Sequence, residues 1–188
     1  MMRKFSLTLL PLAMLGISSV AHAEGYIGLG LGEASVDIEG GVYSSIDDSD
    51  TSVKLFAGKT FSPNLAFESG FIDFGETSLR DPSVDADFDA NALYVAAIGT
   101  IPMDQFHVYG KAGVAHWQLD YAVHYTTGTS YARSERGTDF LYGIGVGFDV
   151  TPLITLRGEV ERYANVGDKN VTGDSDIDVI GITAAMRF

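Results

Sequence analysis

Apolar residues alternate with glycine or polar residues along most of this chain. From Tyr26 to Gly32 the sequence reads YIGLGLG, and from Tyr142 to Phe148 it reads YGIGVGF. Period two is typical of β-strands, because successive side chains point to opposite faces of a sheet. A helix through either stretch would contain several glycines, each costing about 1 kcal/mol relative to alanine. Both stretches therefore predict strands.

Eight segments share this alternation, and the connections between them are short and long in turn. The predicted strands lie near residues 25–36, 51–61, 65–75, 90–101, 105–119, 138–150, 153–164 and 177–188. Short connections at 62–64, 102–104 and 151–152 each contain proline, which favours a tight turn. The connections at 37–50, 76–89, 120–137 and 165–176 are longer and polar. This order predicts one all-β domain, an antiparallel up-and-down meander.

The two faces of the predicted strands differ in polarity. In the seventh segment, Ile154, Leu156, Gly158 and Val160 share one face, while Arg157, Glu159 and Glu161 share the other. A water-soluble barrel would bury the apolar face, whereas a membrane barrel turns it toward lipid and its polar face toward the lumen. Faces made of glycine cannot fill a hydrophobic core, but they leave room in a lumen for large polar side chains. Strands of about ten residues also suit membrane spans of 9–11 residues. We therefore expect a closed, eight-stranded transmembrane β-barrel.

Composition agrees with this interpretation and excludes other classes. The chain has 188 residues, 12 basic and 25 acidic, with a net charge of −13 and no cysteine. Such acidity argues against a nucleic-acid partner, and the lack of cysteine excludes disulfides and thiolate metal sites. The long connections with their flanks (33–50, 73–89, 120–138 and 164–178) contain 18 acidic residues against 4 basic ones. The charge is therefore expected at an exposed rim.

Residues 1–23 are typical of a secretory signal peptide. Arg3 and Lys4 precede an apolar stretch that ends at Val20, and Ala21-His22-Ala23 forms a small-x-small cleavage site. We expect cleavage there, which leaves an exported barrel domain at 24–188.

Aromatic residues are expected in girdles at the two membrane interfaces, because most lie near predicted strand ends. They are Tyr26, Phe61, Tyr94, Phe106, Tyr109, Trp117, Tyr121, Phe140, Tyr142, Phe148, Tyr163 and Phe188. Lys59 lies on the lipid side two residues before Phe61, where its amine can reach the headgroups.

Four stretches resemble the outer-membrane protein A superfamily of eight-stranded transmembrane barrels. They are residues 55–68 (LFAGKTFSPNLAFE), 109–113 (YGKAG), 150–159 (VTPLITLRGE) and the terminal Arg187-Phe188. The resemblance covers essentially the whole chain after residue 23. It implies a monomer in the outer membrane of a Gram-negative bacterium, with both termini in the periplasm and four loops outside. Two features depart from the family: Ala96, Ala97 and Ile98 replace a lumenal lysine, and the chain stops where larger members continue into a peptidoglycan-binding domain, so peptidoglycan anchoring is not implied.

Charged residues on the inward faces form the main candidate site. The predicted lumenal polar network comprises Glu68, Lys111, Asp149, Arg157, Glu159, Glu161 and Arg187, with Lys54 as a further member. Acids and bases across a narrow lumen satisfy one another. The network is either a gated ion path or a polar plug, and the plug is favoured because side chains fill an eight-stranded lumen.

A lipid-modifying enzyme is the less favoured alternative. It would need a serine nucleophile with a histidine in reach. After removal of residues 1–23 the histidines are His107, His116 and His124, and the last shares a long connection with Ser130 and Ser134. We expect no catalytic residue and no cofactor.

Acidic clusters in the long connections are candidate weak contacts for calcium or magnesium. They are Asp47, Asp48 and Asp50; Asp85, Asp87 and Asp89; and Asp174, Asp176 and Asp178. None has the pattern of an EF-hand, so no firm metal site is predicted. Divalent cations could instead bridge these acids to lipopolysaccharide phosphates.

The last predicted strand resembles the signal that the barrel assembly machinery reads. Ile180, Ile182, Ala184, Met186 and Phe188 alternate along it, which also suits a lipid-facing strand. The expected function is envelope integrity or surface contact with an unidentified ligand, in an outer membrane of lipid and lipopolysaccharide. A narrow gated pore is the alternative, and a soluble exported barrel remains open.

Overall fold

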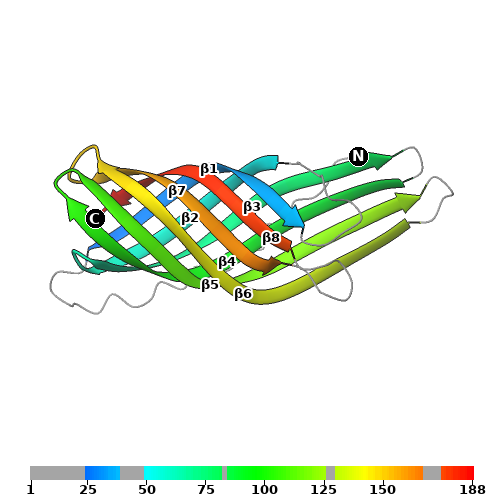
Figure 1. Cartoon of the computed structure of the whole chain (residues 1–188), viewed down its shortest axis with the longest axis horizontal. Coiled ribbons are helices and arrows are strands. Elements are labelled where there is room, and N and C mark those ends of the chain that lie inside the picture. Colours follow the sequence, from blue (N-terminus) through cyan, green and yellow to red (C-terminus); the bar gives the residue numbers. More distant parts are fainter. Residues whose placement is uncertain (1–23, 39–48, 82–83, 126–129, 167–174) are drawn as a thin grey trace.

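Eight antiparallel strands form one closed barrel in the computed structural model, which describes residues 24–38, 49–81, 84–125, 130–166 and 175–188 (Figure 1). The strands are β1 (Gly25–Ile38), β2 (Ser49–Ser62), β3 (Leu65–Asp81), β4 (Val84–Met103), β5 (Phe106–Tyr125), β6 (Ser130–Asp149), β7 (Ile154–Val166) and β8 (Ser175–Arg187). Each pairs with its neighbours in sequence, and β1 pairs with β8 to close the sheet. The predicted fold is confirmed. The signal-peptide prediction for 1–23 concerns residues outside this description.

No helix long and apolar enough to cross a membrane occurs in the described part of the chain.

The outer and inner faces of the barrel have the polarity predicted for a membrane protein. Leu29, Ile144 and Ile182 are each 65–70% exposed on the outside, whereas Glu68 and Lys111 are 3% exposed inside. Every spanning strand repeats this alternation, so the apolar face is outside and the charged face is inside.

Large aromatic rings, more than charged side chains, occupy the space that the inward glycines leave. The ring of Tyr94 lies over Gly70, that of Phe56 over Gly28 and that of Tyr109 over Gly145. The expectation that these glycines accommodate mainly polar groups is therefore only partly right.

Five aromatic residues assigned to the interfacial girdles lie inside the barrel instead. They are Tyr26, Tyr94, Tyr109, Trp117 and Tyr163, each 4% exposed or less. Each has the same parity as the inward charged or small residues on its own strand, so its side chain points inward whatever its distance from the strand end. Phe61, Phe106, Phe140, Tyr142 and Phe188 do lie on the outer face.

Two of the predicted long loops are mostly strand. β3 and β4 remain paired as far as Asp81 and Val84, and β5 and β6 as far as His124 and Ser130. The sequence prediction placed 76–89 and 120–137 in loops because they lack an apolar face. Backbone hydrogen bonds do not require an apolar face. A hairpin that lies beyond the apolar band can therefore be paired although both of its faces are polar.

These extensions make a four-stranded sheet that continues beyond the closed barrel (Figure 1). We call residues 76–81, 84–89, 120–125 and 130–137 the projecting sheet. The neighbouring strands do not extend as far. Toward this end, the pairing of β2 with β3 stops at Val53 and Asp73, and that of β6 with β7 stops at Leu141 and Tyr163. A β-bulge with Gly75 at a φ of 88° marks the point where β3 leaves the barrel.

The opposite end of the barrel has the short turns. Residues 63–64 join β2 to β3, and Asp104, with a φ of 54°, joins β4 to β5. The second turn thus lies just after Pro102 and Met103, which belong to β4, and not on them as predicted. Asn64 donates from its side-chain amide to the Thr100 carbonyl at 2.8 Å, which links the first turn to β4.

Candidate functional site in the barrel lumen

Lys111 on β5 lies at the centre of the polar side chains in the lumen. Its Nζ is 2.8 Å from Glu68 Oε1 on β3, 3.0 Å from Glu159 Oε2 and 2.5 Å from Glu161 Oε1 on β7. All four side chains are buried. A buried charge is costly unless it is paired, and here one ammonium group uses all three of its donors on carboxylates.

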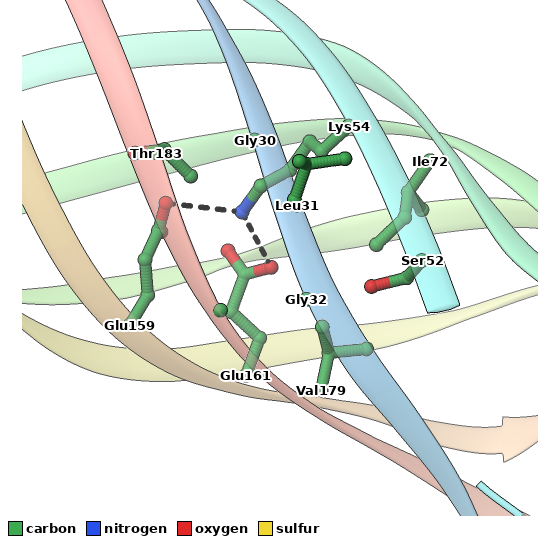
Figure 2. A pocket seen from close by; sticks show the side chains of 11 residues that line it. Gly30, Leu31, Gly32, Ser52, Lys54, Ile72, Glu159, Glu161, Val179 and Thr183 are labelled. Atoms are coloured by element: carbon green, nitrogen blue, oxygen red, sulfur yellow. Dashed lines mark hydrogen bonds and ion pairs between the residues drawn. The ribbon is translucent and has the colours of Figure 1, made fainter. Parts of the chain in front are cut away.

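Two further cations balance the remaining negative charge. Lys54 lies between Glu161 Oε2 at 2.8 Å and Glu159 Oε1 at 3.1 Å (Figure 2). Arg157 Nη1 donates to Glu68 Oε2 at 2.9 Å. Lys54, Glu68, Lys111, Arg157, Glu159 and Glu161 together form what we call the charged layer. Its three acids and three bases cancel, which suits a site with little water.

Tyrosine hydroxyls add hydrogen bonds to two of the carboxylates in the charged layer. Tyr94 donates to Glu68 Oε1 at 2.8 Å, Tyr26 donates to Glu68 Oε2 at 3.1 Å, and Tyr163 donates to Glu161 Oε2 at 3.3 Å. The sequence prediction missed these partners. Their signal was available, because each tyrosine has the same strand parity as an inward-facing charged or small residue.

The guanidinium of Arg157 lies among aromatic rings. Its central carbon is 4.9 Å from the ring centroid of Tyr26, 5.4 Å from that of Phe56 and 5.6 Å from that of Tyr109. Cation–π contacts of this kind are stronger where water is excluded. The ion pair with Glu68 and the surrounding rings together fix Arg157 in one position.

An apolar layer fills the lumen beyond the charged layer, toward the projecting sheet. Ile72, Leu141 and Tyr163 are at most 1% exposed, and Phe74 packs edge-on against Tyr163 with ring centroids 4.9 Å apart. The apolar layer comprises Ile72, Phe74, Trp117, Leu141, Tyr163, Val166, Ile177 and Val179. Between the two layers, the cavity around Lys54 in Figure 2 has a volume of only about 10 Å³, room for about one water molecule.

The end of the lumen near the short turns is hollow. A cavity of about 550 Å³ is lined there by Tyr26, His107, Tyr109 and Arg157, together with residues of the turns. Arg187 Nη2 donates to Asp149 Oδ1 at 2.6 Å and to Thr155 Oγ1 at 2.8 Å at its edge. Asp149 and Arg187 were predicted in one network with Glu68 and Lys111, but they form a separate pair at this end.

The other candidate residues are dispersed. Arg162 binds the Asp178 carboxylate and lies 3.3 Å from Asp176 Oδ2, so these two acids already have a cationic partner. Asp85, Asp87 and Asp89 belong to β4 and are not in a loop, while Asp174, Asp47 and Asp48 lie outside the described residues. No group of three or more His, Cys, Asp or Glu side chains suited to a metal ion occurs among the residues described.

The histidines considered for catalysis are far apart in the barrel. His107 is half-buried near the short turns, and His116 lies on the outer face with its Nδ1 2.9 Å from Thr138 Oγ1. In the strand pairing, His124 is opposite Ser130 on one side and Asp85 on the other. This alignment concerns the backbone positions of the three residues in the projecting sheet.

Comparisons with known proteins agree on one family. Residues 20–188 match the model of the OmpA-like transmembrane domain. Outer membrane protein A of Salmonella typhi is 23% identical over 185 residues, covering 94% of this chain and 53% of that protein. Outer membrane protein P5 of Haemophilus influenzae is 32% identical over 109 residues, covering 55% of this chain and 30% of that protein. The chain thus spans about half or less of the length of these curated relatives.

Solved structures share the fold at low sequence identity. Neisserial surface protein A superposes with a TM-score of 0.67 at 16% identity, covering 89% of this chain and all of that one. Ail, the attachment invasion locus protein of Yersinia pestis, superposes with a TM-score of 0.62 at 20% identity, covering 88% and 99%. Both are eight-stranded barrels of the outer membrane.

Proposed function

Because the chain belongs to the family of OmpA-like transmembrane domains, and so is a β-barrel of the Gram-negative outer membrane, we propose that it is a sealed structural barrel with an external contact surface. In this orientation the short turns face the periplasm and the projecting sheet lies outside the cell. The proposed role is envelope integrity together with contact through that sheet.

The packing of Ile72, Leu141 and Tyr163 carries the proposal that the barrel is sealed. An ion crossing the lumen would have to enter a dry region of aliphatic and aromatic side chains, after leaving the charged layer. Burying an isolated ion in such surroundings costs many kcal/mol. The apolar layer is therefore the barrier to conduction, and the charged layer beneath it holds the strands together.

Planar-bilayer recording tests this proposal directly. The refolded barrel, inserted in a bilayer with salt on both sides, is expected to give no conductance steps. Regular steps from the unaltered protein would overturn the sealed barrel and favour the narrow pore. The same preparation must run faster on an unheated gel than on a heated one, which shows that the protein inserted was folded.

The external surface has a charge that limits its partners. Ail, which shares the fold, has been crystallised with the heparin analogue sucrose octasulfate. In the present chain the outer connections contain 18 acidic and 4 basic residues, so a polyanion of that kind would be repelled. We expect a neutral or cationic surface ligand. Binding of heparin to intact cells that depends on this protein would contradict that expectation.

Assembly in the outer membrane is the remaining part of the proposal. Ile180, Ile182, Met186 and Phe188 are all exposed on the outer face of β8 and its end, next to the seam that closes on β1. We expect this strand to be the part that the barrel assembly machinery recognises. Replacing Phe188 by serine should lower the amount of barrel in cells more than its folding yield in detergent, and equal losses would argue against recognition.

A further inference from the structure

The outer face of β5 and β6 changes from apolar to polar within two rungs of the ladder. Val114 is paired with Phe140, then His116 with Thr138, then Gln118 with Arg136. All are on the outward side, and Phe140 is 68% exposed. The face therefore presents an exposed aromatic ring directly beneath an imidazole, a hydroxyl and a guanidinium.

These polar groups lie at the depth of lipid headgroups. The outward positions of β6 are apolar from Phe148 to Phe140. That stretch is roughly 26 Å long at about 3.3 Å per residue, or about 20 Å along the barrel axis for a strand tilt of about 40°. An apolar band of about 25 Å is usual for these barrels. Thr138 and Arg136 follow immediately beyond its outer edge.

Arg136 has no ion pair or hydrogen bond with any residue that the structure describes. The nearby carboxylate of Asp120 accepts instead from Gln118 Nε2 at 2.8 Å. Nδ1 of His116 lies 2.9 Å from Thr138 Oγ1, which leaves Nε2 of the same ring for another partner. Other outward charges toward this end of the barrel include the acidic Glu33 and Asp73, and Arg162, which is already paired with Asp178.

We propose that this patch, His116, Thr138 and Arg136 above Phe140, binds the phosphate of an outer-leaflet glycolipid. Arginine and imidazole are donors suited to phosphate oxygens, and an aromatic ring below them packs against the sugar or the start of an acyl chain. The occupant is a membrane lipid and not a soluble anion, because the patch continues the lipid-facing surface without a break. The inference rests on the proposed placement in the outer membrane.

Lipid A with two phosphates is the probe, added to the refolded barrel in a neutral detergent and detected by native mass spectrometry. Replacing Arg136 by glutamine should weaken its retention about tenfold, the effect of one lost charge-assisted contact. Arg133→Gln is the matched control, because Arg133 is an exposed arginine on the same strand, 3.9 Å from Glu135. It should change retention less than twofold, and Asp120→Asn should increase retention.

Three results would overturn the proposal. Equal losses for Arg136→Gln and Arg133→Gln would mean general charge attraction without a site. Equal retention of dephosphorylated lipid A would remove phosphate as the recognised group. Displacement by inorganic phosphate at millimolar concentration would assign the patch to a soluble anion. Each protein must first show the gel mobility of a folded barrel, so that failure of the fold is distinguished from failure of the site.

Discussion

Arg187 on β8 and Asp149 at the end of β6 are joined by a 2.6 Å contact that passes across the start of β7. Thr155 of β7 lies between them and hydrogen-bonds both side chains. Three strands are therefore tied together at the end of the barrel with the short turns, close to the seam between β8 and β1.

Replacing Arg187 by alanine should destabilise this end modestly. The Arg187 and Asp149 side chains are 32% and 26% exposed, so the loss should be about 1 kcal/mol, more than for a fully exposed pair and less than for a buried one. Urea titration read by the gel shift of the folded barrel measures it. Asp149→Ala should give a similar loss, and the double variant should cost clearly less than the sum; simple additivity would show that the contact contributes nothing.

Removing Lys111 should be far more damaging. Lys111→Met leaves Glu68, Glu159 and Glu161 buried with one cation fewer, and breaking a buried pair costs about 3–5 kcal/mol. The double variant Lys111→Met/Glu161→Gln removes one charge of each sign and should recover part of that loss. The free energy of unfolding in urea is the measurement. A double variant no more stable than Lys111→Met would contradict the charge-balance account.

Opening the seal requires changes in the apolar layer. Ile72→Ser/Leu141→Ser should give measurable conductance in a planar bilayer, because two of its most buried side chains become small and polar. The outward pair Ile144→Ser/Ile182→Ser is the control for inserted serines and should stay silent. If instead a Lys111→Gln barrel conducts while Ile72→Ser/Leu141→Ser does not, the charged layer is the barrier.

Inward glycines should not tolerate a methyl group. An alanine Cβ at Gly70 would lie 2.7 Å from the Tyr94 ring and 2.7 Å from the Leu55 carbonyl oxygen, so Gly70→Ala should cost about 1–3 kcal/mol. At Gly99, on the outer face, the same atom would meet nothing within 4 Å. Gly99→Ala should therefore leave the unfolding midpoint in urea unchanged or raise it slightly. Equal effects at both positions would rule out crowding in the lumen.

Ser130 should not behave as a nucleophile, although the ladder aligns it with His124 and Asp85. A fluorophosphonate probe should leave the folded barrel unlabelled, because the alignment of backbone positions alone does not make a catalytic triad. Labelling of the unaltered protein that disappears in Ser130→Ala and persists in Ser134→Ala would establish an enzyme and refute our proposal.

Strand parity was the most informative signal in the sequence. It predicted that Glu68 faces inward and Phe67 outward, and the same rule predicted the inward side of Arg157. The inward side of Lys111 was predicted from the family resemblance. Strand parity could not predict that Lys111 reaches Glu161 on β7 while Arg187 stays with Asp149, because the height of a residue depends on the stagger of the closed barrel. That stagger arises from pairing around all eight strands and is not encoded in any one of them.

The sequence pattern also underestimated the length of the hairpins that form the projecting sheet. Asp85, Asp87 and Asp89 look like loop residues when apolar alternation is the criterion, yet they lie in β4. Apolar and polar residues alternate only where one face of a strand is shielded from water. A hairpin with water on both faces therefore shows no such alternation. The apolar layer was not predicted either. The inward face of the barrel was expected to be polar, but Ile72 and Leu141 lie on it.

The apolar layer lies toward the end of the lumen near the projecting sheet and not at its middle. The lumen is therefore filled at that end and hollow at the end near the short turns. In the proposed orientation, the cavity beside the Asp149–Arg187 pair opens to the periplasm alone, so this pair should experience the ionic strength of that compartment. If the proposed seal holds, a change of salt outside the cell should leave that cavity unaltered, because mobile ions screen only the charges they can approach. A barrel built this way keeps its internal electrostatics constant while its outer rim meets a variable environment.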